Sequence, residues 1–188
     1  MASMAEIWTR FRPRGPLRAC LAHEARHVQA MDNTDDPILK AFAEGAIAGY
    51  RQRFENPFDA DFSAVFRIEK TESETAFGLV EFVQAPDVYG AMCIARHAAL
   101  TPETLAVGVT SCGWAAPTDG LVPPSEHPER RRVLMVVLGD RMMNTCSAVL
   151  FEGDSEPQLA LSNGEGLLAE AFQDMLIGMI VSTAASQN

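Results

Sequence analysis

The sequence predicts an α+β protein with a mostly antiparallel sheet of four to five strands. Two helical patterns precede the first strand, the β-prone segments then follow with one helix among them, and a last helix comes after the strands. This order, ααβ(β)αβββα, lacks the regular alternation of a parallel sheet. At 188 residues, of which 47% are apolar, the chain is long enough for one domain with a sizeable core. We therefore expect a single domain over residues 1–188, with its helices on one face of the sheet.

Two helices are predicted before the sheet. Over residues 17–31 apolar side chains recur at helical spacing, and the polar run DNTDD then ends the pattern. The next helix runs toward residue 54, because Asp36 suits its cap and Pro37 suits its first position. The chain thus enters its first strand from a pair of helices.

Two further helices are predicted later in the chain. Pro86 and Asp87 open a middle helix that runs to about residue 99, and a C-terminal helix covers residues 166–181. The apolar stripe of the C-terminal helix consists of Leu168, Phe172, Met175, Leu176 and Met179.

Five segments have strand character. Residues 62–68 alternate apolar and polar side chains, as a half-buried strand does, and residues 76–83 form a shorter apolar run. Residues 105–114 lead into a proline-rich loop. The unbroken apolar run at 133–138 is typical of a central strand that is buried on both faces, and residues 146–151 are expected to pair with it as a hairpin.

The net charge of −10 is distributed unevenly, because residues 1–30 carry five arginines and only two glutamates. The acidic remainder argues against a general nucleic-acid surface and leaves only the Arg10 to Arg18 arm for such a contact. Pro13 and Gly15 favour an extended arm over residues 1–16. This arm is either a solvated lead-in segment or a tail that grips an acidic partner or phosphates.

Cysteine usage and hydropathy predict where the protein works. The N-terminus has no signal-peptide pattern and the cysteines form no CxxC pair, which indicates free thiols in the cytoplasm. The longest uncharged apolar run, around residues 176–181, falls short of the roughly 20 residues that cross a bilayer, so we expect no membrane span. The four cysteines are Cys20, Cys93, Cys112 and Cys146.

The sharpest motif is the segment HEARH at residues 23–27, which has the HExxH pattern of zincin metallopeptidases. On a helix, His23 and His27 lie four residues apart and can share one Zn²⁺, while Glu24 can deprotonate a bound water. Glu24 also falls within the apolar stripe of its helix, so it either pairs with an arginine of the arm or is a functional acid. The motif makes zinc the candidate cofactor and Glu24 the candidate catalytic base.

A third ligand for such a zinc site has to come from downstream. Asp61, or else Asp59, follows the second helix in the segment NPFDAD, which is similar to the NP-x-E-x-E segment of small zincin-like proteins but carries Asp where they carry the longer Glu. Two features oppose a peptidase. Only 22 residues precede the motif, too few for the strands that line a zincin cleft, and Arg26 occupies a position that is usually uncharged.

A second group of reactive side chains surrounds the long loop after residue 114. Cys112, Asp119 and His127 are the residue types of a thiol hydrolase, although their spacing matches no known catalytic template. The alternative is a structural loop that Trp114 pins to the core and prolines shape.

Three consecutive arginines, Arg130 to Arg132, follow this loop and enter a strand. Because successive side chains alternate across a strand, the arginines must project to both faces of the sheet. At least one of them therefore has to lie along the inner face or find an acidic partner, and an anion site there is the functional alternative.

Two segments of the C-terminal half carry a resemblance. CGWAAPTD at residues 112–119 and SEHPERRRV at residues 125–133 resemble a group of proteins from actinobacteria and their phages that share a GWAAP-x-D…HPxRRRV pattern. VLFE at residues 149–152 and the closing helix fit the same group. The resemblance implies a phage or mobile-element accessory protein, such as a virion component or a host-interaction factor. It implies no particular chemistry.

The sequence therefore favours a non-catalytic interaction or assembly protein, located in the cytoplasm or in a virion. Its partner is expected to be another protein or a second copy of the chain, with no cofactor and no membrane. The alternative function is a small zinc hydrolase that uses the HExxH segment.

Overall fold

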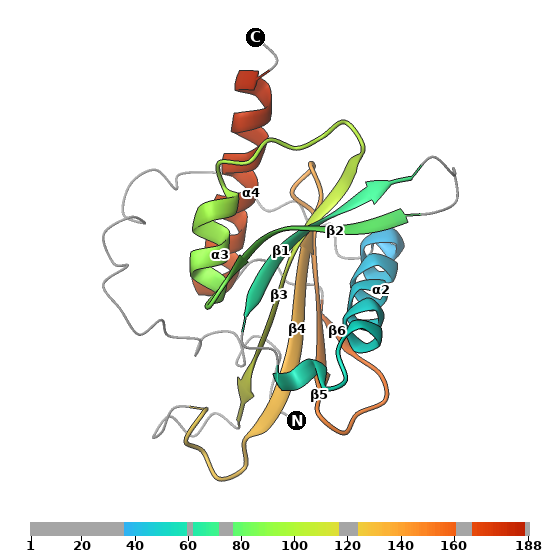
Figure 1. The fold of residues 1–188 in the computed structure, drawn as a ribbon, viewed down its shortest axis with the longest axis vertical. Coiled ribbons are helices and arrows are strands. Elements are labelled where there is room, and N and C mark those ends of the chain that lie inside the picture. The colour runs from blue at the N-terminus through green and yellow to red at the C-terminus, as the bar shows by residue number, and fades with distance from the viewer. Residues whose placement is uncertain (1–35, 60–61, 72–76, 117–123, 161–166, 187–188) are drawn as a thin grey trace.

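A computed structural model describes most of the chain after its first 35 residues. One antiparallel sheet of six strands carries three α-helices and one 3₁₀ turn in this part of the chain (Figure 1). The predicted α+β class is thereby confirmed, with one strand more than expected. The basic arm and the helix predicted at 17–31 lie outside the described residues. Those residues are 36–59, 62–71, 77–116, 124–160 and 167–186.

Helix α2 (Pro37–Arg53) begins as the sequence predicts. Asp36 caps it, because its Oδ1 accepts hydrogen bonds from the backbone N–H groups of Ile38 at 2.8 Å and Leu39 at 3.3 Å. Pro37 stands at the first helical position, where a missing N–H costs nothing. The short turn η2 (Pro57–Asp59) follows and leads the chain into the sheet.

Strands β1 (Ser63–Lys70) and β2 (Phe77–Ala85) pair antiparallel. Their register shifts between Val65 and Phe66, so β2 carries a bulge opposite this point. Helix α3 (Val88–Ala95) then crosses to the next strand and ends four residues earlier than predicted.

Strand β3 (Thr104–Ala115) pairs with β1 on one side and with β4 (Arg131–Gly139) on the other. β4 and β5 (Thr145–Phe151) form the predicted hairpin. Asp140 closes its turn, because its Oδ1 accepts hydrogen bonds from the backbone N–H groups of Met142 and Asn144 at 2.8 and 2.9 Å.

Strand β6 (Gln158–Ala160), a three-residue strand that pairs with β5, was not predicted. Helix α4 (Leu167–Ser186) then completes the described fold. It is the one described helix that is long and apolar enough to cross a membrane by length and composition, over Leu168–Ser186, and 33% of this segment is buried inside the protein. We expected no membrane span, because the uncharged apolar run around residues 176–181 is short.

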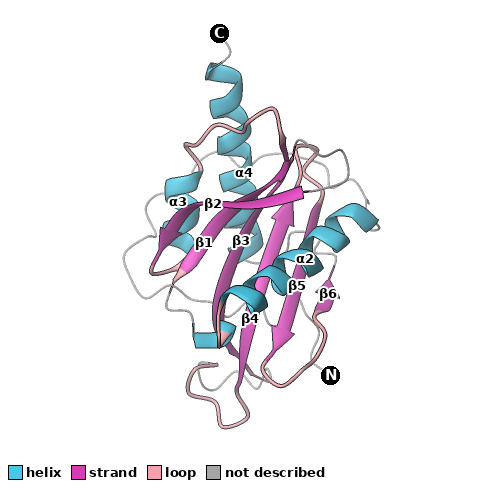
Figure 2. Cartoon of the chain, turned by 45° about the vertical axis from the view of Figure 1, so that its right-hand side comes forward, coloured by secondary structure: helices cyan, strands magenta, loops and turns pink. Residues whose placement is uncertain are grey.

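The strands lie in the order β2-β1-β3-β4-β5-β6, and helices cover both faces of the sheet. Helix α2 packs on one face, whereas α3 and α4 pack together on the other (Figures 1 and 2). Our expectation of helices on a single face is therefore wrong. The reason lies in β4, where Val133, Met135 and Val137 face α3 and α4 while Leu134, Val136 and Leu138 face α2. A strand that is apolar on both faces needs a cover on both.

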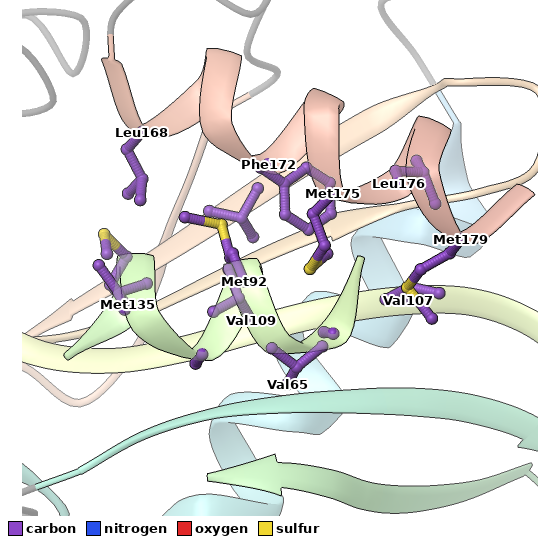
Figure 3. Packing of buried hydrophobic residues seen from close by; sticks show 14 of the residues in the cluster. Val65, Met92, Val107, Val109, Met135, Leu168, Phe172, Met175, Leu176 and Met179 are labelled. Atoms are coloured by element: carbon purple, nitrogen blue, oxygen red, sulfur yellow. The ribbon is translucent and has the colours of Figure 1, made fainter. Parts of the chain in front are cut away.

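The predicted stripe of α4 forms the centre of the core on the α3–α4 face. Side chains from α4 point toward Met92 of α3 and toward the sheet residues Val107, Val109 and Met135 (Figure 3). The five residues predicted for this stripe are each at most 1% exposed. Burial of large apolar side chains of this kind is the main favourable contribution to folding.

The core on the α2 face is built around Phe66, which is fully buried. Its ring lies above Gly108 of β3 so closely that a Cβ atom at position 108 would come within 2.4 Å of Phe66 Cζ and of Leu138 Cδ2. Gly108 is therefore required by close approach of the aromatic ring, and not by a turn.

Candidate functional site

The structure describes one residue of the predicted zinc set. Asp59, in the turn η2, is exposed, and both of its carboxylate oxygens have partners. Oδ1 accepts a hydrogen bond from Arg132 at 2.8 Å, and Oδ2 accepts one from Asn56 Nδ2 at 2.5 Å. His23, Glu24, His27 and Asp61 lie outside the described residues, so the zinc site stays a prediction. Among the residues that are described, no three His, Cys, Asp or Glu side chains are placed to hold a metal ion.

The residues suggested for a thiol hydrolase have structural contacts where they are described. The Cys112 thiol donates a hydrogen bond to the backbone carbonyl of Pro57 at 2.8 Å. His127 is buried, and its Nδ1 accepts a hydrogen bond from the backbone N–H of Glu129 at 3.0 Å. Asp119 lies outside the described residues. These contacts favour the structural interpretation of the loop over a thiol hydrolase.

The three cysteines that the structure describes are free, as predicted for them. Cys93 is exposed, Cys112 is half-buried and Cys146 is buried. Burial raises the pKa of Cys146 to about 11. That thiol therefore has the properties of a core residue and not those of a nucleophile. Cys20 lies outside the described residues.

The arginines at the start of β4 project to both faces of the sheet, as predicted. Arg131 pairs with Asp154 at 2.7 Å and lies over the ring of Phe151, while Arg132 pairs with Asp59 on the opposite face. Each of the two has an acidic partner from its own chain, so these contacts favour a structural role over an anion site.

Trp114, near the end of β3, is contacted by two of these arginines. The guanidinium groups of Arg130 and Arg132 lie 4.7 and 4.9 Å from the centre of its ring. Arg132 also donates to the backbone carbonyl of Phe58 and so ties β4 to the turn η2. Stacking and ion pairing within the chain therefore hold Trp114, Arg130 and Arg132.

A polar network that sequence reasoning missed joins α2 to β2. Glu81 accepts hydrogen bonds from Tyr50 Oη at 2.5 Å and from Gln84 Nε2 at 2.9 Å, and it forms an ion pair with Arg53 at 2.6 Å. The Glu81 side chain is only 12% exposed. Tyr50 and Glu81 are 31 residues apart in the sequence, and no local pattern predicts a contact between them.

The network holds Glu81 in its charged form. Burial by itself raises the pKa of Glu81, but the hydrogen bonds from Tyr50, Arg53 and Gln84 outweigh it, so that the pKa lies below its ordinary value. Burial and the hydrogen bond to Glu81 raise the pKa of Tyr50 well above its ordinary value. The arrangement is a neutral phenol donating to a carboxylate, which suits a structural clamp between helix and strand.

Next to this clamp, apolar side chains lie at the surface. Phe77 is 52% exposed and Leu79 is 37% exposed at the start of β2, and Ile38 of α2 is 60% exposed. Phe42, one helical turn after Ile38, contacts Phe77 edge to face with ring centres 5.1 Å apart. These four residues, which the Phe42–Phe77 contact joins across α2 and β2, are here called the α2–β2 patch.

A second set of exposed apolar residues lies on the opposite face. Ile94 of α3 and Ile177 and Val181 of α4 are exposed, and the two helices pack against each other. We call this set the α3–α4 ridge. α3 contacts β2 and α4, so the α3–α4 ridge lies on the face of the sheet opposite α2.

The fold and these contacts define the class of the protein as an α+β protein with one antiparallel sheet between two helical layers. Comparisons of the chain with protein-family descriptions, with curated proteins and with solved structures found no match.

Proposed function

We propose that the chain is a non-catalytic interaction or assembly protein and that the α2–β2 patch is its contact surface. The observation that carries the proposal is the patch itself, in which Ile38, Phe77 and Leu79 are exposed and Phe42 joins the helix to Phe77 of the strand. Single exposed apolar residues are normal on a protein surface, but contiguous ones mark contact sites.

The contacts of the chemically reactive residues support the same proposal. Cys112, His127, Arg131 and Arg132 each hold loops, strands or turns of their own chain together. The resemblance to a group of proteins from actinobacteria and their phages supports a role as a phage or mobile-element accessory protein, in the cytoplasm or in a virion. The partner is accordingly another protein, or a second copy of the chain, and no cofactor is required.

We expect the tagged chain, purified from its source, to be recovered in a complex of fixed stoichiometry. Phe77→Lys places a charge in the patch and is expected to reduce the complex at least about tenfold, since a charge buried at an apolar contact has to be desolvated. Mass determination by light scattering and identification of the bound chain by mass spectrometry are the measurements.

Val181→Lys is the matched control, because it makes the same kind of change on the α3–α4 ridge. The complex is expected to persist in this variant. An unchanged chain that behaves as a monomer and binds nothing would overturn the proposal, and so would a complex that only Val181→Lys removes.

The alternative proposal is a small zinc hydrolase in which His23, His27 and Asp61 bind the metal and Glu24 acts as base. The HExxH segment supports it, and Asp59 is the weaker ligand choice because Arg132 and Asn56 occupy its oxygens. Elemental analysis after purification without chelator separates the two proposals. The zinc hydrolase proposal predicts one zinc ion per chain, which His27→Ala removes. A protein that contains no zinc after growth with added zinc would overturn it.

A further inference from the structure

The patch lies beside the longer free edge of the sheet. β2 is the terminal strand on one side of the sheet and spans nine residues, whereas β6 on the other side spans three. In the described part of the chain, no strand pairs with the outer side of β2. An edge of this length offers a row of backbone donors and acceptors to another strand.

The usual defences of an edge strand are weak in β2. Its sequence, FGLVEFVQA, has no lysine and no proline, and its single charge is Glu81. That carboxylate is directed to Tyr50 and Arg53 of its own chain. The bulge opposite Val65 and Phe66 lies beyond Glu81, so the first residues of β2 keep a regular register with β1.

We propose that two copies of the chain associate edge to edge through antiparallel β2–β2 pairing, which joins their sheets into one. This inference rests on the proposed function and names the partner as a second copy. Phe77 and Leu79 of one copy lie alongside the same segment of its partner. The two strands that meet are identical, and an antiparallel pair of identical strands has the two-fold symmetry that a closed dimer requires.

The first residues of β2 allow two acidic chains to meet at this edge. The chain carries a net charge of −10, so two copies repel each other over most of their surface. The start of β2 is uncharged, and the one carboxylate behind it is compensated by Arg53. Two copies that pair along this segment bring none of its own side chains into like-charge contact, and added salt is expected to strengthen the dimer by screening the repulsion between the rest of the two chains.

The size of the contact sets the expected affinity. Nine residues of strand extend over roughly 30 Å, and with a sheet about 10 Å thick the edge alone buries far less than the roughly 800 Å² per partner of a standard interface. Ile38 and Phe42 widen the contact on the α2 side. We therefore expect a dimer with a dissociation constant in the micromolar range, visible as a change of mass with concentration.

Sedimentation equilibrium on the full chain, from low micromolar to several hundred micromolar, tests the proposal. The mass is expected to rise toward twice the 20.4 kDa of the chain. Leu79→Lys introduces an edge lysine and is expected to raise the dissociation constant at least about tenfold. Ile38→Lys, on the helix and outside the sheet, is also expected to raise the dissociation constant. The test therefore does not depend on Leu79→Lys folding normally.

Hydrogen exchange distinguishes strand pairing from a contact of side chains alone. On dimerisation the backbone amides of β2 gain protection if they bond to the partner strand. If Leu79→Lys weakens the dimer but the β2 amides gain no protection on dimerisation, strand pairing is overturned. If Val181→Lys breaks the dimer and Leu79→Lys leaves it intact, the choice of surface is overturned.

The proposal and the broader function fail in different ways. A chain that stays monomeric at every concentration overturns self-association through β2. If that monomer still recovers a different protein through Phe77, the interaction function stands. If it recovers none, both fail.

Discussion

Replacing Phe66 by alanine is expected to lower the free energy of unfolding by about 3–5 kcal/mol. Phe66 is fully buried beneath α2, and its ring centre lies 6.3 Å from that of Tyr50. Removal of the ring leaves a cavity between the helix and β3, because the sheet below cannot move up to fill it. Urea denaturation followed by circular dichroism measures the loss.

Gly108 provides a sharper form of the same test. Gly108→Ala alone is expected to cost about 1–3 kcal/mol, since its methyl group overlaps the Phe66 ring. In the Phe66→Ala background only the Leu138 contact remains, and Leu138 can shift into the space left by the ring, so the second substitution is expected to cost less. Gly78→Ala on β2 is the control, because the nearest side-chain atom there is at 3.7 Å. Strictly additive effects of the two substitutions at 66 and 108 would contradict the close packing.

Glu81→Ala is expected to lower the free energy of unfolding by about 2–3 kcal/mol at neutral pH. The substitution leaves the hydroxyl of Tyr50, a residue that is 4% exposed, without its charged acceptor. The loss of Arg53 as a partner contributes little, because that side chain is 52% exposed. Denaturation of Tyr50→Phe and of the double variant completes the cycle, in which Glu81→Ala is expected to cost less once the hydroxyl is gone.

The stabilisation by Glu81 is expected to depend on pH. Its pKa in the folded protein lies below its ordinary value of 4.5, so folding favours the charged carboxylate. The contribution is therefore complete above pH 4.5 and is lost as the pH falls through the folded-state value. The difference in stability between the unchanged protein and Glu81→Gln should shrink on acidification. Glu156→Gln, an exposed carboxylate before β6, controls for the loss of one charge. A difference that grows in acid would refute the assignment.

Local patterns predicted the elements whose signals are local. Asp36 and Pro37 mark the start of α2, and the five apolar residues of α4 face the core as their spacing predicts. The apolar run at 133–138 also indicates on which faces of the sheet the helices lie, which we predicted wrongly. Its apolar residues fill both faces of β4, which already requires helices on both sides of the sheet.

The remaining features depend on contacts between distant parts of the chain. The apolar run around Phe77 predicts a strand, but nothing in it shows that this strand lies at the edge with Phe77 and Leu79 exposed. The pairing of Arg132 with Asp59 joins residues 73 apart, and the Tyr50–Glu81 hydrogen bond is similarly remote. β6 is too short for a periodic signal. The candidate contact surface therefore became visible only in three dimensions.

The position of α4 after all the strands affects how the protein is made. The five other strands can pair around β4, and α2 can cover its side of the sheet, before α4 has left the ribosome. Until then Val107, Val109 and Met135 are covered only in part, by α3. A nascent chain at this stage exposes an apolar sheet face, which becomes covered when the last helix docks.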